Sequence, residues 1–317
     1  MRFPRFVGDA VMQLPILRLL RQMGVGPLVV YGPASTVSLV QGHELADCVA
    51  PESKKAGSIE LSKMFKQHKA ARSICFPKTL RPALAAWLAG VPERIGVSDG
   101  GAKLFNTHHA PFWRTEGPFV NRYREALAKR WPGLPPMPFA DYLPVVQVDK
   151  PKNGYICLMP GSVWPSKAWP VEHFRELAKR IRQVAMDVVI LGAAHERELG
   201  GAVLDGGGYN LCGQTDLPHA AAWLAGAAAA IGNDSGLSHL AAACGTRTIA
   251  IYGPTDPGGS APWGPGVITL KPQNTPCSPC FKRQCPLPGR PCLADISPER
   301  VWEWLVPFPN QNCGTQF

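Results

Sequence analysis

Short apolar runs alternate with longer amphipathic stretches along this chain. Six apolar runs have the length and composition of buried strands: residues 28–31, 73–76, 155–159, 187–191, 227–231 and 248–252. Four stretches have the apolar spacing of helices: residues 60–72, 82–89, 171–184 and a segment that ends at Cys244, before Gly245. The repeated order of strand, loop and helix predicts an α/β fold with doubly wound parallel sheets covered by helices.

Residues 131–154 interrupt this pattern. The run Trp131-Pro-Gly-Leu-Pro-Pro-Met-Pro is rich in residues that end helices and strands, and the polar stretch 148–154 contains Pro151. We therefore expect a boundary near residue 150 and two domains, 1–150 and 151–317. Each is long enough to bury a core of its own.

The strands expected in the second domain are followed by loops of small and polar residues. Ligands of open parallel sheets bind at the carboxyl ends of the strands, where these loops gather. The pattern places six residues around one crevice: Gly161, Ser162, His195, Asp234, Ser235 and Gly253.

The segment 231–239 is the most informative of these loops. It leads from a strand through Gly232-Asn-Asp-Ser-Gly directly into a helix, whose first amides lack partners and carry partial positive charge. Gly232 and Gly236 allow close approach, so the segment suits a diphosphate. The alternative is a helix capped by Asp234 or Ser235 with no ligand. A serine hydrolase is disfavoured because no Gly-x-Ser-x-Gly elbow is present.

Two further positions carry candidate chemistry. Lys167 lies between two Trp-Pro pairs in Pro160-Gly-Ser-Val-Trp-Pro-Ser-Lys-Ala-Trp-Pro, and bulky neighbours fix where a lysine points. Asp9 follows the expected first strand, where a carboxylate facing the cleft between domains can act as a general base toward a sugar hydroxyl. The alternatives are a surface lysine beside packed tryptophans and a helix cap at Asp9.

The net charge of the chain indicates which class of partner it binds. The chain has 33 Lys and Arg against 23 Asp and Glu, a net charge of +10, which favours anionic partners. No apolar run is long enough to span a membrane, and the charges of Arg2, Arg5, Asp9 and Arg18 are not those of a signal peptide. We therefore expect a cytoplasmic protein.

Four clustered cysteines admit several interpretations. Cys277, Cys280, Cys285 and Cys292 include one Cys-x-x-Cys pair, so they could hold zinc, or they could be loop thiols or a disulfide. Nucleic-acid binding is disfavoured because the basic stretch 60–72 offers only Phe65 for stacking. A dehydrogenase is disfavoured because no Gly-x-Gly-x-x-Gly follows a strand.

Together these motifs resemble the lipopolysaccharide heptosyltransferases of glycosyltransferase family 9, in particular the heptosyltransferase II branch. The resemblance covers nearly the whole chain and rests on motifs in a fixed order. They are residues 6–12, 88–96, 159–162 with 167–170, and 232–243 followed by 251–257, and the cysteine segment with Ser297-Pro-Glu is also similar.

The resemblance implies a GT-B architecture, in which two Rossmann-like domains face each other across a cleft. The first domain would take the acceptor and the second the nucleotide-sugar. The implied reaction moves L-glycero-D-manno-heptose from an ADP-linked donor to the lipopolysaccharide inner core, with inversion. Asp9 would be the base, and Lys167 would hold the diphosphate and offset its charge as ADP leaves. The other implied donor-binding residues are Ser162, Glu196, Asp234, Ser235, Gly236 and His239.

The resemblance also gives the basic residues of the first domain a partner. Lys63, Lys66, Lys78 and Arg81 would orient the anionic inner-core acceptor, and the same surface would rest on the inner face of the inner membrane. The alternative is a solvated helix face. We expect no required metal, because Lys167 and a helix N-terminus can neutralise the diphosphate, although Mg²⁺ stimulation is allowed.

Two departures from the family pattern bear on activity. Only Met1, Arg2 and Phe3 precede Pro4, so the first strand is expected to be short, and little chain follows Trp302 and Trp304 to form a closing helix. Two alternatives therefore stay open. One is a GT-B transferase for another nucleotide-sugar or acceptor, and the other is an inactive member that binds nucleotide-sugar without turnover.

Overall fold

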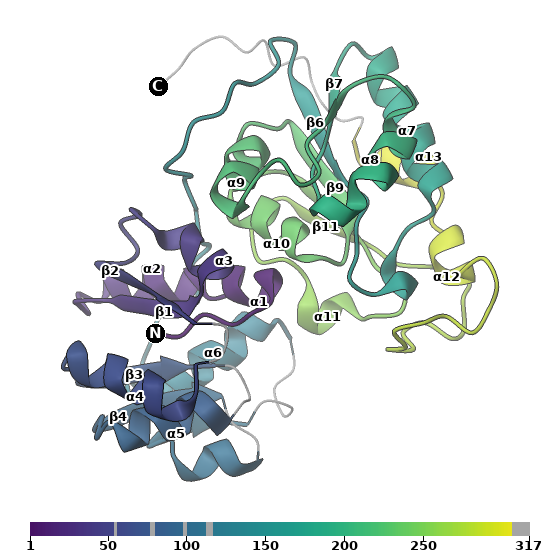
Figure 1. Ribbon diagram of the computed structural model, residues 1–317. Helices are drawn as coiled ribbons and strands as arrows, with labels where there is room; N and C mark the ends of the chain where they lie inside the picture. The colour runs from purple at the N-terminus through teal and green to yellow at the C-terminus, as the bar shows by residue number, and fades with distance from the viewer. Residues whose placement is uncertain (54–55, 77–79, 98–99, 112–116, 306–317) are drawn as a thin grey trace.

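Figure 1 shows the computed structural model of the chain, which describes residues 1–53, 56–76, 80–97, 100–111 and 117–305. All strand pairs in these ranges are parallel. The α/β fold expected from the sequence is confirmed. The strands up to residue 110 form one group and those from residue 155 onward form another.

The first sheet has two well-paired parts joined by the short segment of residues 1–3, whose backbone hydrogen bonds reach Tyr31 on one side and Ile74 on the other. β1 (Val29–Pro33) pairs with β2 (Cys48–Glu52). β3 (Arg72–Cys75) pairs with β4 (Glu93–Val97), which pairs with β5 (His108–Ala110). Arg2 lies between the two parts and bridges Tyr31 of β1 and Cys75 of β3. The first strand is thus as short as the sequence predicts.

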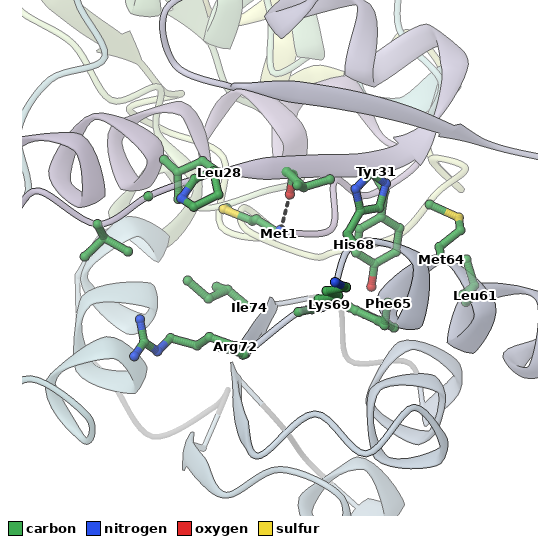
Figure 2. A pocket seen from close by; sticks show the side chains of 16 residues that line it. Met1, Leu28, Tyr31, Leu61, Met64, Phe65, His68, Lys69, Arg72 and Ile74 are labelled. Atoms are coloured by element: carbon green, nitrogen blue, oxygen red, sulfur yellow. Dashed lines mark hydrogen bonds between the residues drawn. The ribbon is translucent and has the colours of Figure 1, made fainter.

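A cavity of about 220 Å³ lies at the amino edge of this sheet, beside Met1. Its walls come from the starts of β1 and β3 and from the residues that follow α4 (Ser58–Gln67), including His68 and Lys69. In Figure 2, Met1 lies between Leu28 and Ile74, and its backbone nitrogen donates to the carbonyl of Val29 at 2.5 Å. β1 and β3 are therefore separated by an apolar hollow at this edge.

The second sheet is continuous, with strand order β11–β10–β9–β6–β7–β8. Its strands are β6 (Tyr155–Met159), β7 (Asp187–Ile190), β8 (Tyr209–Asn210), β9 (Ala229–Asn233), β10 (Thr248–Ile251) and β11 (Val267–Leu270). Counted along the chain from β6, the order is 3-2-1-4-5-6, which is that of a Rossmann sheet. The first sheet has the same order when the segment around Arg2 is counted as its first strand. The point where the order reverses lies between β6 and β9.

Alternate residues of the central strands face two different helical layers. Ile156 and Ile231 pack in one cluster with Phe174 of α7 (Val171–Gln183). Cys157 and Ala230 pack in another cluster with α9 (Leu217–Ala225) and α10 (Gly236–Ala243). Both faces are covered, so these strands are apolar throughout instead of alternating with polar residues.

The remaining helices lie around the two sheets, and most of them are labelled in Figure 1. They are α1 (Val7–Val11), α2 (Leu14–Gln22), α3 (Ala34–Val37), η1 (Ser38–Val40), α5 (Leu80–Leu88), η2 (Gly100–Leu104), α6 (Phe119–Ala128), η3 (Pro165–Lys167), η4 (Ala194–Glu196), α8 (Arg197–Leu204), α11 (Pro257–Ser260), α12 (Pro291–Ala294) and α13 (Pro298–Glu303). No helix in the described ranges has the length and apolar character needed to cross a lipid bilayer.

One predicted helix was too long. The helix expected over 60–72 ends at Gln67, and Arg72 is the first residue of β3. Lys69, with a φ of +46°, turns the chain between them. The lysine spacing continues past the end of the helix, which is why the pattern did not reveal its end.

Residues 129–154 contain no helix or strand and connect the two sheets. They pack on both halves of the molecule: the Tyr142 hydroxyl donates to the carbonyl of Leu39 at 2.6 Å, and its backbone N–H donates to the carbonyl of Ala243 at 2.8 Å. The Trp263 indole donates to the carbonyl of Pro138 at 2.9 Å. A boundary near residue 150 stays a prediction.

Candidate functional site

A cavity of about 710 Å³ lies between the two halves of the molecule. Its first wall includes residues at and before the start of α1 (Arg5, Phe6, Val7 and Gly8) together with Ser35 and Ser38. Its second wall is made of loops at the carboxyl ends of β6, β7 and β9. The cavity thus lies at the edge where the sequence placed a ligand crevice.

Only some of the predicted donor-binding residues line this cavity. Ser162, Glu196, Ser235 and Gly236 do so. Lys167, Asp234 and His239 are not lining residues but lie close to one another, and Asp9 also lies outside the lining. The predicted residues therefore form two layers: one lines the cavity, and the other, which we call the supporting layer, does not.

The supporting layer holds a short ion pair. The Lys167 ammonium lies 2.6 Å from Oδ2 of Asp234, and the Thr255 hydroxyl donates to the same oxygen at 2.7 Å. The two charged side chains are 17% and 7% exposed. The Lys167 nitrogen also lies 4.7 Å from the centre of the Trp164 ring, which limits its position from another side. Asp234 thus acts on Lys167 directly and holds it at the switch point of the sheet.

Asn233 is a site residue that the sequence analysis missed. Its side chain is fully buried at the end of β9. The amide nitrogen donates to the carbonyl of Pro160 at 2.8 Å, and the amide oxygen accepts from the backbone N–H of Trp169 at 2.9 Å. Asn233 therefore ties together the two ends of the loop that carries Ser162 and Lys167. A polar residue at the end of an otherwise apolar strand was the available signal.

Helices α1 and α10 touch with almost no space between them. A Cβ at Gly236 would lie 2.6 Å from Cβ of Val7, and a Cβ at Gly8 would lie 3.0 Å from Cδ2 of His239. The glycines in both predicted motifs are thus explained by packing between the two halves of the molecule. The sequence analysis expected Gly236 to admit a phosphate, and the structure gives it this second role.

His239 is buried in this contact, with 6% of its surface exposed. Burial lowers the pKa of the imidazole to about 4, because desolvation disfavours its charged form; Asp234 opposes the shift and Lys167 adds to it. The ring is therefore neutral at pH 7 and contacts Gly8 of α1.

Asp9 lies in the first turn of α1 and is partly buried. Its charge contributes, after burial, to a raised pKa of Tyr123 in α6. Asp9 is thus close to Tyr123, in the first half of the molecule, while its neighbour Gly8 lines the cavity. The predicted base and the predicted donor loops are brought to the same junction.

Glu196 forms part of the cavity wall through its own loop. One carboxylate oxygen accepts from the backbone N–H of Ala193 at 2.7 Å. The other lies so close to Gly161 that a Cβ there would be 2.0 Å from it. Thr215 and Asp216 complete this part of the wall and were not predicted. Asp216 caps α9 by accepting from the backbone N–H of His219 at 2.9 Å.

The predicted acceptor-binding residues do not form one cluster. Lys63 and Lys66 are exposed on α4, and Lys66 is in its last turn, toward the amino edge of the sheet and away from the cavity. Arg81 contacts the Glu52 carboxylate at 3.3 Å and also donates to the carbonyl of Ala56. Lys78 lies outside the described residues.

The four clustered cysteines line a separate cavity of about 160 Å³ with Ser166. All four are free thiols, and no three His, Cys, Asp or Glu side chains in the described ranges are placed to hold a metal ion. Burial raises the pKa of Cys292, and the other three cysteines raise it further. The Ser166 hydroxyl donates to the carbonyl of Lys282 at 2.6 Å, so this loop packs against the loop of Lys167.

Two parallel sheets of one strand order, with a cavity between their halves, are the architecture of a GT-B glycosyltransferase. The chain belongs to glycosyltransferase family 9 (heptosyltransferase), whose family model matches residues 59–290.

The similarity to individual proteins extends over nearly the whole chain. This chain is 25% identical to lipopolysaccharide heptosyltransferase 2 of Escherichia coli K12, over 95% of each chain. The solved structure of E. coli ADP-heptose lipopolysaccharide heptosyltransferase II superposes with a TM-score of 0.75 at 25% identity, covering 96% of both chains. An E. coli heptosyltransferase solved with ADP gives a TM-score of 0.71 at 22% identity, covering 96% of this chain and 99% of the other.

Proposed function

We propose that this protein transfers L-glycero-D-manno-heptose from ADP-heptose to an acceptor in the lipopolysaccharide inner core. The observation that carries the proposal is the Lys167–Asp234 pair, fixed at the switch point of the second sheet behind a cavity of about 710 Å³. The names of the relatives, which are lipopolysaccharide heptosyltransferases, support the same reaction.

The donor would bind against the second half of the molecule. Ser235 and Gly236, at the start of α10, line the cavity, and the first amides of this helix would offer partial positive charge to the diphosphate. Ser162, whose hydroxyl donates to the carbonyl of Trp164 at 3.1 Å, would turn this donor to the diphosphate from the opposite loop, and Glu196 would accept from the ribose hydroxyls. A diphosphate at this position would compete with Asp234 for the Lys167 ammonium.

The transfer would proceed in one displacement. Asp9 takes the proton from an acceptor hydroxyl, whose oxygen attacks the anomeric carbon from the face opposite the diphosphate. The bond from that carbon to the diphosphate oxygen breaks, and ADP leaves with the electron pair. Lys167 offsets the charge that develops on the leaving group. A single displacement inverts the configuration at the anomeric carbon.

No metal is required in this proposal, and Mg²⁺ would at most stimulate transfer. The neutralising groups are Lys167 and the start of α10, both supplied by the chain. Turnover should therefore persist in excess EDTA. Loss of all turnover on chelation, restored by Mg²⁺, would contradict this part of the proposal.

The acceptor is anionic and lipid-linked, which agrees with the net charge of +10. We place the protein in the cytoplasm, peripherally attached to the inner membrane. Lys63, Lys66 and Lys78 remain predicted acceptor contacts. The Arg81 guanidinium already has partners, so its contribution to acceptor binding should be smaller.

The proposal is tested first by calorimetric titration with ADP, UDP and GDP. We expect selective ADP binding that weakens at least tenfold in Lys167→Ala, because the variant loses the cation nearest the diphosphate. Lys179→Ala, an exposed lysine of α7, is the matched control and should bind as the wild type does. Preference for UDP or GDP would instead indicate another nucleotide-sugar, and no binding by the folded protein would indicate an inactive family member.

The role of Asp9 needs a separate measurement. Asp9→Asn should reduce turnover by about 10²–10⁴-fold, the usual contribution of a general base, while ADP affinity stays unchanged. Near wild-type turnover by this variant would exclude Asp9 as the base.

A further inference from the structure

Helix α5 presents an apolar face to solvent. Leu80, Trp87 and Leu88 are 44%, 52% and 41% exposed. Their spacing of seven and eight residues places them on one side of the helix. The side that packs inward carries Ala83, Ala85 and Ala86, which are buried. α5 thus fills its inward contacts with small residues and directs its large apolar side chains outward.

The short helix η2 lies against this face and enlarges it. A Cβ at Gly101 would lie 3.7 Å from Cδ1 of Leu80. At the other end of α5, the rings of Trp87 and Phe105 meet edge to face with their centres 5.5 Å apart. Between them, Leu104 is 82% exposed. We call the surface formed by Leu80, Trp87, Leu88 and Leu104 the α5–η2 face.

Positive charge is concentrated in the same part of the chain. Residues 58–131 contain 13 Lys and Arg against 5 Asp and Glu, which accounts for most of the net charge of +10. Lys103 is exposed beside Leu104 in η2. Lys103 and Lys129 both lower the pKa of His109, after burial, so the two ammonium groups lie near the same edge strand, β5. The α5–η2 face therefore has an exposed cation, Lys103, at its edge, in the part of the chain that carries most of the positive charge.

We propose that the α5–η2 face is the surface by which this protein binds an anionic lipid bilayer. Tryptophan and leucine side chains enter the interfacial region, where an indole ring is favoured. A lysine near the bilayer surface, such as Lys103, adds attraction to anionic headgroups. A purely apolar protein partner would match the leucines but would offer no counter-charge to Lys103.

The position of this face suits a lipid-linked acceptor, a point that rests on the proposed function. Leu80 and Leu104 belong to elements that follow the carboxyl ends of β3 and β4. The carboxyl edge of this sheet is also where Asp9 follows the first strand. A protein resting on its α5–η2 face would thus hold its acceptor side close to the bilayer. In Figure 1, α5 lies at the end of the molecule remote from the second sheet, so donor binding stays clear of the membrane.

Vesicle co-sedimentation tests the proposal. The wild-type chain is mixed with vesicles of phosphatidylcholine alone or with one quarter phosphatidylglycerol. We expect binding that is at least tenfold tighter with phosphatidylglycerol and that weakens with added salt. The double variant Trp87→Gln, Leu104→Gln should bind at least tenfold more weakly. Val184→Gln is the matched control, since Val184 is 54% exposed but lies after α7 in the other half.

Three results would overturn the proposal: no binding of the folded wild type, equal binding of the double variant, or equal loss in Val184→Gln. A change from dimer to monomer in the double variant without vesicle binding would instead identify the face as a contact between copies. ADP titration of the same proteins separates this proposal from the proposed function. Vesicle binding without ADP binding would contradict the function and leave the docking surface in place.

Discussion

The two sheets have one strand order but are held together differently. In the second sheet, β6 pairs along its length with β7 on one side and β9 on the other. In the first sheet, the corresponding central position is occupied by residues 1–3, which make backbone hydrogen bonds to Val29 and Tyr31 on one side and to Ile74 on the other, beside a cavity of about 220 Å³. The same topology therefore rests on a full-length backbone ladder in one half and on a much shorter one in the other.

Ion pairs between side chains also hold the first segment in the first sheet. The Arg2 guanidinium lies 2.8 Å from the Glu52 carboxylate, and both side chains are less than a tenth exposed. Arg81 contacts the same carboxylate from α5. This ion cluster links the first segment, the end of β2 and α5. We therefore expect the first half to be the less stable one, and we expect its stability to depend on these ion pairs.

The largest effect is expected from Arg2→Met. Removing one partner of a buried ion pair costs about 3–5 kcal/mol; Arg81 stays with Glu52, so we expect the lower end of that range. Calorimetric unfolding should show the loss as an earlier transition of the first half. Arg81→Met, which removes a guanidinium that is 36% exposed, is the control and should cost less. Equal losses in the two variants would contradict the importance of the Arg2 link.

A somewhat smaller loss of stability is expected when the pH is lowered, because His239 is buried at the contact between α1 and α10. The pKa of His239 is about 4 in the folded protein against 6.5 for an ordinary histidine. The unfolded chain binds the proton first, so the stabilisation present above pH 6.5 is lost as the pH falls toward 4. The slope is about 1.4 kcal/mol per pH unit, or roughly 3 kcal/mol in all.

His239→Gln should therefore remove that part of the pH dependence, measured as the difference in unfolding free energy between variant and wild type. The comparison with wild type is needed because burial also lowers the pKa values of His43, His109 and His173. His195→Gln, at a side chain that is 80% exposed, is the control. If the pH dependence of the unfolding free energy were the same in His239→Gln and wild type, the pKa of His239 would not be lowered in the folded protein.

The smallest effect is a gain of stability. Ala70 lines the cavity beside Met1 and packs against the core cluster of α4 and α5. Ala70→Val should fill part of the cavity and stabilise the first half by about 0.5–1 kcal/mol. Ala89→Val, against the same cluster but away from the cavity, should give no gain. Chemical denaturation of both variants measures the difference, and a loss of stability in Ala70→Val would show that the hollow cannot accept a larger side chain.

Four strands of the second sheet were predictable because each is an apolar run between turn residues, whereas the edge strands β8 and β11 were not predicted. The run at 155–159 matches β6 at both ends. The end of α4 was not predictable, since Ala70 and Ala71 continue a helical composition after the helix has stopped. The crevice could be located from the alternation of strands and helices along the chain, because loops that follow parallel strands meet at one edge.

The division of the site into two layers could not be read from one sequence. Lys167 and Asp234 are 67 residues apart, and nothing local to either residue shows that they form a pair. The burial of His239 is equally non-local, since it depends on α1 covering α10. Asn233 could have been found, because it is a polar residue directly after an apolar run, where an amide that becomes buried must satisfy its hydrogen bonds.

The contact between α1 and α10 also determines how the molecule can move. The two helices meet at Gly8 and Gly236 with no room for even a methyl group at position 236. Sliding that brings a side chain over either glycine would cause a clash, so we expect the two halves to move relative to each other by rotation about this contact. In such a rotation the cavity walls at Ser35 and Thr215 would change their separation. The residues beside the contact, including Asp9, would move less.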